Sequence, residues 1–129
     1  MKAKIVYASL SAIIPSILIF FAVAGCAKPE VGSLDQNRRV AEEFVKMDST
    51  FRFDGIPNTF NLAVTTSVAN GWKFDIKFDS EHSGYGNRTG KSLVEVTTPH
   101  VAVVTVQAGK VASAIMDGSW DMITHRELE

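Results

Sequence analysis

Two runs of residues that suit β-strands, 60–69 and 72–81, are separated only by Asn70 and Gly71. An Asn-Gly pair between such runs favours a two-residue turn, because both residues tolerate the positive φ angles that this turn requires. The spacing therefore predicts an antiparallel hairpin. No other feature restricts the fold as strongly, because a hairpin fixes both the pairing of its strands and the face on which each side chain lies.

The predicted turn also sets the register of this hairpin. It pairs Ala69 with Trp72, and so places large side chains of the second strand opposite small side chains of the first. The further pairs on this face are Ser67 with Phe74, Thr65 with Ile76 and Ala63 with Phe78. We expect this face to be the core face.

A second hairpin is predicted from residues 100–107 and 111–117, which are rich in valine, alanine and isoleucine and are separated by residues 108–110. Apolar residues on both faces of these runs are typical of interior strands. Residues 51–55 alternate like a short strand, and residues 93–97 indicate a further strand. Pro99 lies between this last strand and the second hairpin, and either bends the chain or ends the strand there.

A helix is predicted before the sheet, from about Leu34 to Lys46. Ser33 and Gln36 stand at the spacing of a reciprocal cap. Apolar residues then form one stripe at helical spacing, while charged residues lie on or near the solvated side. The apolar stripe is Val40, Ala41, Phe44 and Val45, and the charged set is Arg38, Arg39, Glu42 and Glu43.

One helix followed by an antiparallel sheet of four or five strands is an α+β fold, with the helix on the face that carries Trp72, Phe74, Ile76 and Phe78. We expect a single domain over residues 34–129. In outline it is similar to cystatin-like rolls. This likeness concerns element order only and implies no function.

The first 25 residues differ in composition from the rest, since Lys2 and Lys4 precede an uncharged, largely apolar run over residues 5–25. This order predicts an export segment. Its end, Val23-Ala24-Gly25-Cys26, resembles the lipobox of prokaryotic lipoproteins. The resemblance implies a type II signal peptide over residues 1–25, diacylglycerol and acyl chains on Cys26, and a tether over residues 26–33.

Both interpretations of residues 5–25 predict an extracytoplasmic domain. In the first, a lipid-anchored protein sits at the cell membrane or outer membrane, because two or three acyl chains on Cys26 bind a bilayer stably where one does not. In the second, residues 5–25 remain as a membrane-spanning helix, for which about 20 apolar residues suffice. Membrane lipid is the predicted partner, and in the lipoprotein interpretation the contact is made through Cys26.

Composition excludes several functional classes. The chain has 129 residues with 13 basic and 14 acidic side chains, so it lacks the basic excess that nucleic-acid binding requires. Its single cysteine excludes an internal disulfide and a cysteine-rich zinc site. We expect no nucleic-acid partner, no metal, and no cofactor besides the lipid on Cys26.

The longest polar segment, residues 82–91, contains three glycines and is unusually long for so small a domain. We interpret it as a ligand or partner loop in which Arg88 and backbone amides can hold an anion and Tyr85 can stack or donate. The alternative is an ordinary surface connection. Asn87-Arg88-Thr89 also matches the N-x-Thr pattern of glycan acceptors.

Three histidines, His82, His100 and His125, lack the spacing of a zinc-binding helix. A second turn at Ala108 and Gly109 places His100 opposite Asp117. This pair would stand at the end of a face formed by Val104, Val106 and Ile115. A histidine held by a carboxylate can act as a base or metal ligand, or can be a purely structural pair.

From about Phe44 to Trp120 the chain resembles a group of small, uncharacterised prokaryotic exported proteins. The resemblance rests on residues 51–56, 84–90, 98–100, 109–111 and 117–121. It implies the domain boundaries and carries no activity.

The leading hypothesis is a lipid-tethered, non-enzymatic domain that binds an envelope protein or a small ligand through residues 82–91 and nearby side chains. The predicted binding residues are His82, Tyr85, Asn87, Arg88, His100, Asp117, Trp120 and Asp121. The alternative is a small metal-binding protein or hydrolase that uses His82, His100 and Asp117. A purely structural envelope protein is the third possibility.

Overall fold

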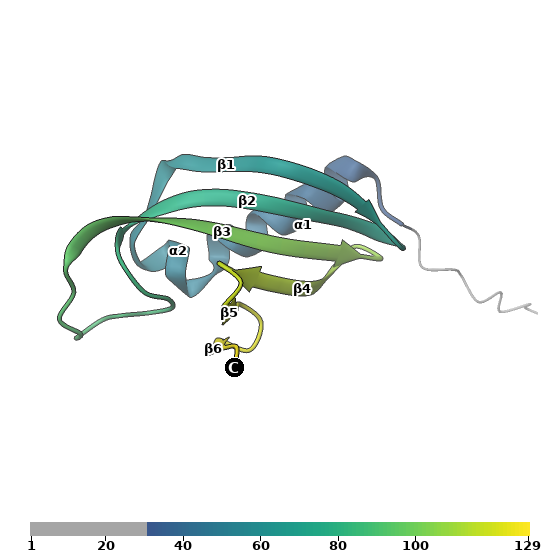
Figure 1. Cartoon of the computed structure of the whole chain (residues 1–129). Coiled ribbons are helices and arrows are strands. Elements are labelled where there is room, and N and C mark those ends of the chain that lie inside the picture. Colours follow the sequence, from purple (N-terminus) through teal and green to yellow (C-terminus); the bar gives the residue numbers. More distant parts are fainter. Residues whose placement is uncertain (1–30) are drawn as a thin grey trace, which may run out of the picture.

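A computed structural model describes residues 31–129, which form two helices and one sheet of six strands (Figure 1). The elements are α1 (Leu34–Met47), α2 (Ser49–Asp54), β1 (Gly55–Val68), β2 (Gly71–His82), β3 (Glu95–Gln107), β4 (Lys110–Met116), β5 (Trp120–Asp121) and β6 (Arg126–Glu127). The sheet is antiparallel and follows the chain order, so the fold is α+β, as predicted. The predicted signal peptide, Cys26 and most of the tether lie outside the described residues.

Helix α1 begins and packs as its sequence predicts. The Ser33 hydroxyl accepts from the Gln36 backbone N–H at 3.3 Å, and the Gln36 side chain accepts from the Ser33 backbone N–H at 3.0 Å. Ala41 and Val45 are fully buried, and Val40 and Phe44 pack against the core beside them. The helix contacts β2, β3 and β4, so the sheet supplies the surface that its apolar stripe needs.

The prediction of a strand over residues 51–55 was wrong, because residues Ser49–Asp54 form helix α2. The Asp48 side chain caps this helix by accepting from the Thr50 backbone N–H at 2.8 Å. The ring of Phe51 then packs edge-on against Phe78 in the core, at 5.1 Å between ring centroids. Alternation over a few residues does not reveal this long-range contact, whereas the cap explains why the helix starts where it does.

The first hairpin is confirmed, but its turn and register differ from the prediction. Its turn residues are Ala69 and Asn70, with Asn70 at φ 59°, and Gly71 already belongs to β2. A Cβ atom on Gly71 would lie 1.9 Å from the Val106 backbone oxygen, so glycine is needed here for close approach of β3.

The register therefore shifts by two residues along β1, which keeps the same side chains of β2 on the core face. The pairs are Ser67 with Trp72, Thr65 with Phe74 and, after an irregularity near Ala63, Leu62 with Ile76. Phe74, Ile76 and Phe78 are buried under the helices, as predicted.

The second hairpin turns at Ala108 and Gly109, which take φ angles of 50° and 72°. A bulge in β4 changes which of its side chains face the core, because Val106 pairs with Val111 but Thr105 pairs with Ser113.

The predicted face of Val104, Val106 and Ile115 was therefore wrong, because Ile115 pairs with Val103 and lies on the opposite face. Ala114 and Met116 are buried instead, and Ile115 lies half-buried on the other face.

The sheet has more strands than the four or five expected, because two short strands, β5 and β6, follow the second hairpin. The separate strand predicted at residues 93–97 was wrong as well, since its second half is the start of β3. Pro99 lies inside β3 and pairs with Asp79 of β2, whereas β4 pairs with β3 only from Ala102 onward. Proline is tolerated because one side of β3 has no strand at this point.

The core lies between the helices and one face of the sheet. It consists of Ala41, Val45, Phe74, Ile76, Phe78, Ala102, Val104, Val106, Ala114, Met116 and Met122. No helix within residues 31–129 is long and apolar enough to cross a membrane.

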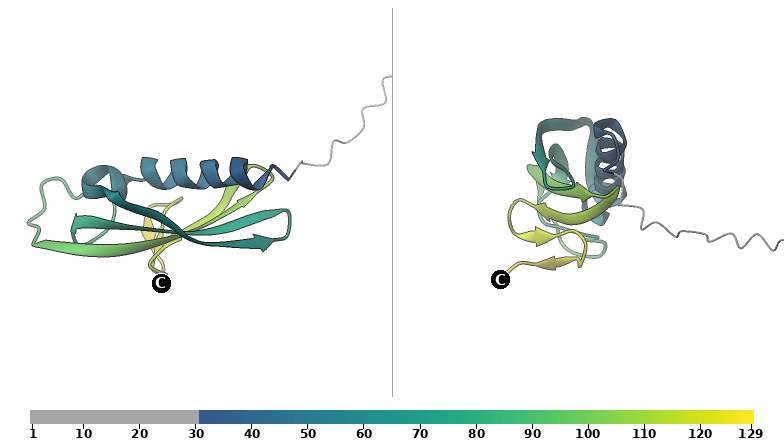
Figure 2. Two further views of the ribbon diagram at one scale, coloured as in Figure 1. Left: turned by 90° about the horizontal axis from the view of Figure 1, so that it is seen from above. Right: turned by 90° about the vertical axis from the view of Figure 1, so that its right-hand side faces the viewer.

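The two ends of the domain differ in what they carry (Figure 2). Residue 31, where the described chain begins, lies at the end that also holds the β1–β2 and β3–β4 turns. The segment between β2 and β3, residues 83–94, lies at the other end beside α2. We call this segment the long loop. His82, which the sequence placed in the loop, is the last residue of β2.

Candidate functional site

The long loop is held against α2 and β5 by its glycines. Gly84, Gly86 and Gly90 have φ angles of 95°, 71° and 79°, as their loop position predicted. Gly86 is buried, and its backbone N–H donates to the Thr50 hydroxyl at 2.8 Å. The loop is therefore docked on the domain along part of its length.

Arg88 fixes the loop from inside. Its side chain is 3% exposed, and its guanidinium donates to the Asp54 carboxylate and to the Ser83 backbone oxygen, the latter at 3.1 Å. The guanidinium also lies over the ring of Phe53, at 4.7 Å from the centroid. The anion bound by Arg88 in this structure is Asp54, and an external anion would have to displace it.

His82 shares the same carboxylate. Its ring nitrogen Nδ1 lies 2.9 Å from Asp54 Oδ2, and its backbone N–H donates to that oxygen at 2.9 Å. We call Asp54, His82 and Arg88 the Asp54 cluster. The sequence analysis missed Asp54, which had been assigned to a short strand, and the only signal for it was an acidic residue at the end of the alternating segment Phe51-Arg52-Phe53.

His100 and Asp117 form the predicted pair. His100 is 2% exposed, and its Nδ1 lies 2.7 Å from Asp117 Oδ2. Asp117 adopts a φ angle of 53°, and its other carboxylate oxygen accepts from the Val101 backbone N–H at 2.7 Å. The second ring nitrogen of His100, Nε2, lies 3.0 Å from the hydroxyl oxygen of Ser80, which the sequence analysis also missed.

The order Ser80, His100, Asp117 resembles a catalytic triad, but the hydrogen bonds run the wrong way for one. The Ser80 hydroxyl lies 2.6 Å from the His82 backbone oxygen, which can only accept, so its single proton points there. Ser80 can then only accept from His100, which requires the proton on Nε2. A triad needs Nε2 to accept the serine proton, and Ser80 is also fully buried.

Tyr85 connects the loop to this pair. Its hydroxyl donates to Asp117 Oδ2 at 3.1 Å and lies 3.1 Å from the Ser119 hydroxyl. Its ring stacks on Trp120, at 5.4 Å between centroids and 9° between planes. Burial raises the pKa of Tyr85 above 10.0, and the nearby Asp117 carboxylate adds to this effect.

Asp121 and Asn87 lie outside both groups and bond to their own segments. The Asp121 carboxylate accepts from the backbone N–H groups of Thr124 and Ile123, which lower its pKa below 3.8. Asn87 is exposed, and its Oδ1 accepts from the backbone and hydroxyl of Thr89 at 3.0 and 2.6 Å. The glycan on Asn87 stays a prediction.

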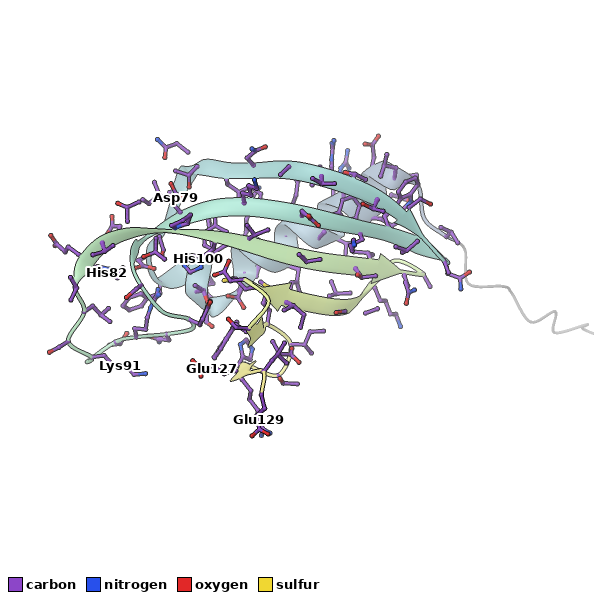
Figure 3. The ribbon with its side chains drawn as sticks, viewed as in Figure 1. Asp79, His82, Lys91, His100, Glu127 and Glu129 are labelled. Atoms are coloured by element: carbon purple, nitrogen blue, oxygen red, sulfur yellow. The ribbon has the colours of Figure 1, made fainter. Side chains whose placement is uncertain are left out.

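The structure thus brings six of the eight predicted residues into two adjoining groups. One is the Asp54 cluster, which contains His82 and Arg88, and the other contains Tyr85, His100, Asp117 and Trp120. Ser80 links them, because it contacts both His100 and the His82 backbone. His82 and His100 both lie toward the long-loop end of the sheet (Figure 3). Across residues 31–129, no three His, Cys, Asp or Glu side chains are placed to hold a metal together.

A cavity of about 350 Å³ opens beside these groups. Its lining residues are Ser83, Gly84, Tyr85, Arg88, Lys91, Leu93, Trp120 and Glu127. We call it the Tyr85–Trp120 cavity. Its walls combine an aromatic stack, one aliphatic side chain and three charged side chains, two basic and one acidic, so it can recognise a surface or ligand of mixed polarity.

No protein-family model, curated protein or solved structure matches this chain.

Proposed function

We propose that the protein is a lipid-anchored, extracytoplasmic protein of the cell envelope whose folded domain is a non-catalytic binding domain. In this proposal Cys26 carries the lipid, and the domain binds an envelope protein or a small ligand at the Tyr85–Trp120 cavity. The α+β roll, cystatin-like in outline, serves as the scaffold that holds the long loop.

The position of the cavity carries this proposal. The described chain begins at one end of the domain, and the long loop lies at the other (Figure 2). Helix α1 alone, with 14 residues, spans about 21 Å between these ends. An anchor that precedes residue 31 would therefore join the domain at the end opposite the long loop, which forms one wall of the cavity, so an envelope partner could reach this loop from the side away from the anchor.

The chemistry of the site favours binding over catalysis. The His100 ring and the Arg88–Asp54 pair are buried, and these groups already have partners, since His100 bonds to Asp117 and Arg88 to Asp54. The cavity wall is also lined by the exposed Lys91 and half-buried Leu93 of the loop and by the exposed Glu127 of β6. A general base must reach the proton that it removes, whereas a binding surface needs only complementary shape and charge.

The binding proposal is tested by cross-linking in native membranes followed by mass spectrometry of the captured partners or ligands. We expect Lys91→Ala combined with Leu93→Ala to abolish the specific cross-links. Lys110→Ala is the matched control, because Lys110 is also exposed but lies at the opposite end, beside the β3–β4 turn. An unchanged set of cross-links in the double variant would refute the cavity as the binding site.

The anchor is tested separately by the intact mass of protein extracted from its own membranes, beside a Cys26→Ser variant. A mass that begins at Cys26 and includes acyl chains, lost in the variant, supports the lipoprotein. A full-length mass without lipid contradicts it and favours a membrane-spanning segment over residues 5–25. The same spectrum reveals any glycan on Asn87.

The alternative proposal is a metal-binding protein or hydrolase that uses His82, His100 and Asp117. The arrangement of Ser80, His100 and Asp117 is the observation in its favour. Against it, His82 bonds to Asp54 and not to the His100 pair. Elemental analysis after native purification tests the metal version, because a stoichiometric transition metal supports it. A melting temperature that does not change on zinc addition contradicts it.

A further inference from the structure

A second, larger cavity lies where the two helices meet the long loop. Its volume is about 520 Å³, which is within the usual range of about 300 to 1,000 Å³ for small-molecule sites. Its lining residues are Met47, Ser49, Arg52, Phe53, Asn87, Thr89 and His125. We call it the Arg52–His125 cavity. Four separate segments meet here: the end of α1, helix α2, the long loop and the β5–β6 connection.

The charge of this cavity is one-sided. Arg52 and His125 can both carry positive charge, and no lining residue is acidic, although the whole chain has 14 acidic and 13 basic side chains. Arg52 is exposed and forms no ion pair within residues 31–129. The neighbouring carboxylates of Asp48 and Asp121 accept from backbone N–H groups.

The neutral polar groups of the cavity are also arranged to donate. Asn87 Oδ1 accepts from the Thr89 backbone N–H and from its hydroxyl, so the acceptor side of this amide is occupied. The amide nitrogen of Asn87, which only donates, is left for a ligand, and the Ser49 hydroxyl can add another donor. A ligand that satisfies these groups must itself present acceptors.

The remaining walls are apolar. Met47 is 67% exposed, and the ring of Phe53 lies against the Arg88 guanidinium on one side, which fixes the orientation of that ring. A ligand that fills the cavity would therefore cover apolar surface as well as bind the donors.

From these features we infer that the Arg52–His125 cavity binds a small organic anion, in which a carboxylate or phosphate group is attached to an apolar or aromatic body. The oxyanion accepts from Arg52 and Asn87, because guanidinium and amide donors match planar or tetrahedral oxyanions. The apolar body covers Met47 and Phe53. This site is separate from the Tyr85–Trp120 cavity and does not depend on its function.

The test is an NMR titration of the isotope-labelled full chain in a nonionic detergent, with three probes of similar size. Benzoate carries a carboxylate, phenyl phosphate carries a phosphate, and benzyl alcohol is the neutral control. We expect saturable shifts of the Ser49, Asn87 and Thr89 amides with one or both anions and none with benzyl alcohol. The anion that binds tighter identifies the preferred group.

Two variants decide whether Arg52 is responsible. We expect Arg52→Gln to weaken anion binding about tenfold or more, since a charge-assisted hydrogen bond contributes at least about 1.4 kcal/mol. Arg39→Gln is the matched control, because Arg39 is likewise an exposed helical arginine, and it should leave the affinity unchanged. The inference is overturned if the anions give no saturable shifts, if Arg52→Gln binds as the wild type does, or if the shifts appear around Lys91 and Trp120 instead.

Discussion

Replacing Asp54 by asparagine should destabilise the domain strongly. Asp54 Oδ1 accepts from Arg88, and Oδ2 accepts from the backbone N–H of His82 and lies beside its ring. The Asp54 side chain is 4% exposed and that of Arg88 is 3% exposed. Asparagine keeps the shape of the side chain, but it removes the negative charge and turns one acceptor into a donor that faces other donors.

The cost follows from the buried charge that remains. Removing one partner of a buried ion pair costs about 3 to 5 kcal/mol, because the other charge is left without compensation in a poorly solvated place. A domain of this size has about 5 to 15 kcal/mol of stability in total. Since 1 kcal/mol shifts the melting temperature of such a domain by about 4 to 8 °C, Asp54→Asn should lower it by at least about 12 °C.

The assay is thermal unfolding of the full chain in nonionic detergent, followed by circular dichroism. Asp35→Asn is the matched control, because Asp35 lies 3.6 Å from Arg38 but both side chains are solvent-exposed. Exposed pairs contribute about 0 to 1 kcal/mol, so this control should melt within a few degrees of the wild type, about 8 °C at most.

A double variant, Asp54→Leu with Arg88→Met, separates the charge effect from general damage. It removes both charges, so it should be more stable than the sum of the two single variants predicts. The reasoning is refuted if Asp54→Asn melts like Asp35→Asn, or if the double variant shows simple additivity.

Three further predictions concern other parts of the domain. Gly71→Ala should lower the free energy of unfolding by more than about 3 kcal/mol, because its Cβ would lie 1.9 Å from the Val106 backbone oxygen. Gly109→Ala should lower it by only about 1 to 2 kcal/mol, because the added Cβ meets open space and only the φ angle of 72° is unfavourable. Urea unfolding compares the two variants, and equal losses would contradict the close approach at Gly71. Ser80→Ala should cost about 1 to 3 kcal/mol by the same measurement, because Nε2–H of His100 loses its acceptor, and a neutral result would mean that His100 does not donate to Ser80. The difference in absorbance at 295 nm between wild type and Tyr85→Phe should titrate above pH 10.0, because burial favours the protonated phenol and raises the pKa of Tyr85. The stability that Tyr85 contributes is therefore complete below the unfolded pKa and is lost as pH rises through the higher folded pKa. A titration midpoint at or below pH 10.0 would contradict the raised pKa.

The sequence by itself determined the features whose causes lie within a few residues. The cap of α1 at Ser33 and Gln36 and the apolar stripe of that helix were predictable, because an N-cap and a 3.6-residue period are local. The positive φ angles of the loop glycines were predictable for the same reason. The contact of His100 with Asp117 was predicted from the second turn, but the bulge in β4 shifts that register, and the contact is made by the side chain of Asp117, which lies next to Val101 at the end of β4.

Features that depend on contacts between distant strands were decided only by the tertiary structure. The turn of the first hairpin moved to Ala69 and Asn70, since Gly71 had to meet β3 without a side chain. The bulge in β4 places Ala114 and Met116, and not Ile115, on the same face as Val104 and Val106. Residues 51–55 alternate like a strand, yet the contact of Phe51 with Phe78 and the Asp48 cap favour a helix.

The candidate sites divide in the same way. Sequence indicated which residues near the long loop carry useful chemistry, but only the fold showed that Asp54, 34 residues before Arg88, neutralises it. Ser80 and the Arg52–His125 cavity likewise depend on segments that meet at one end of the sheet. A buried charge or donor is satisfied by whichever group the packing of the core brings within reach, and that choice depends on the whole chain.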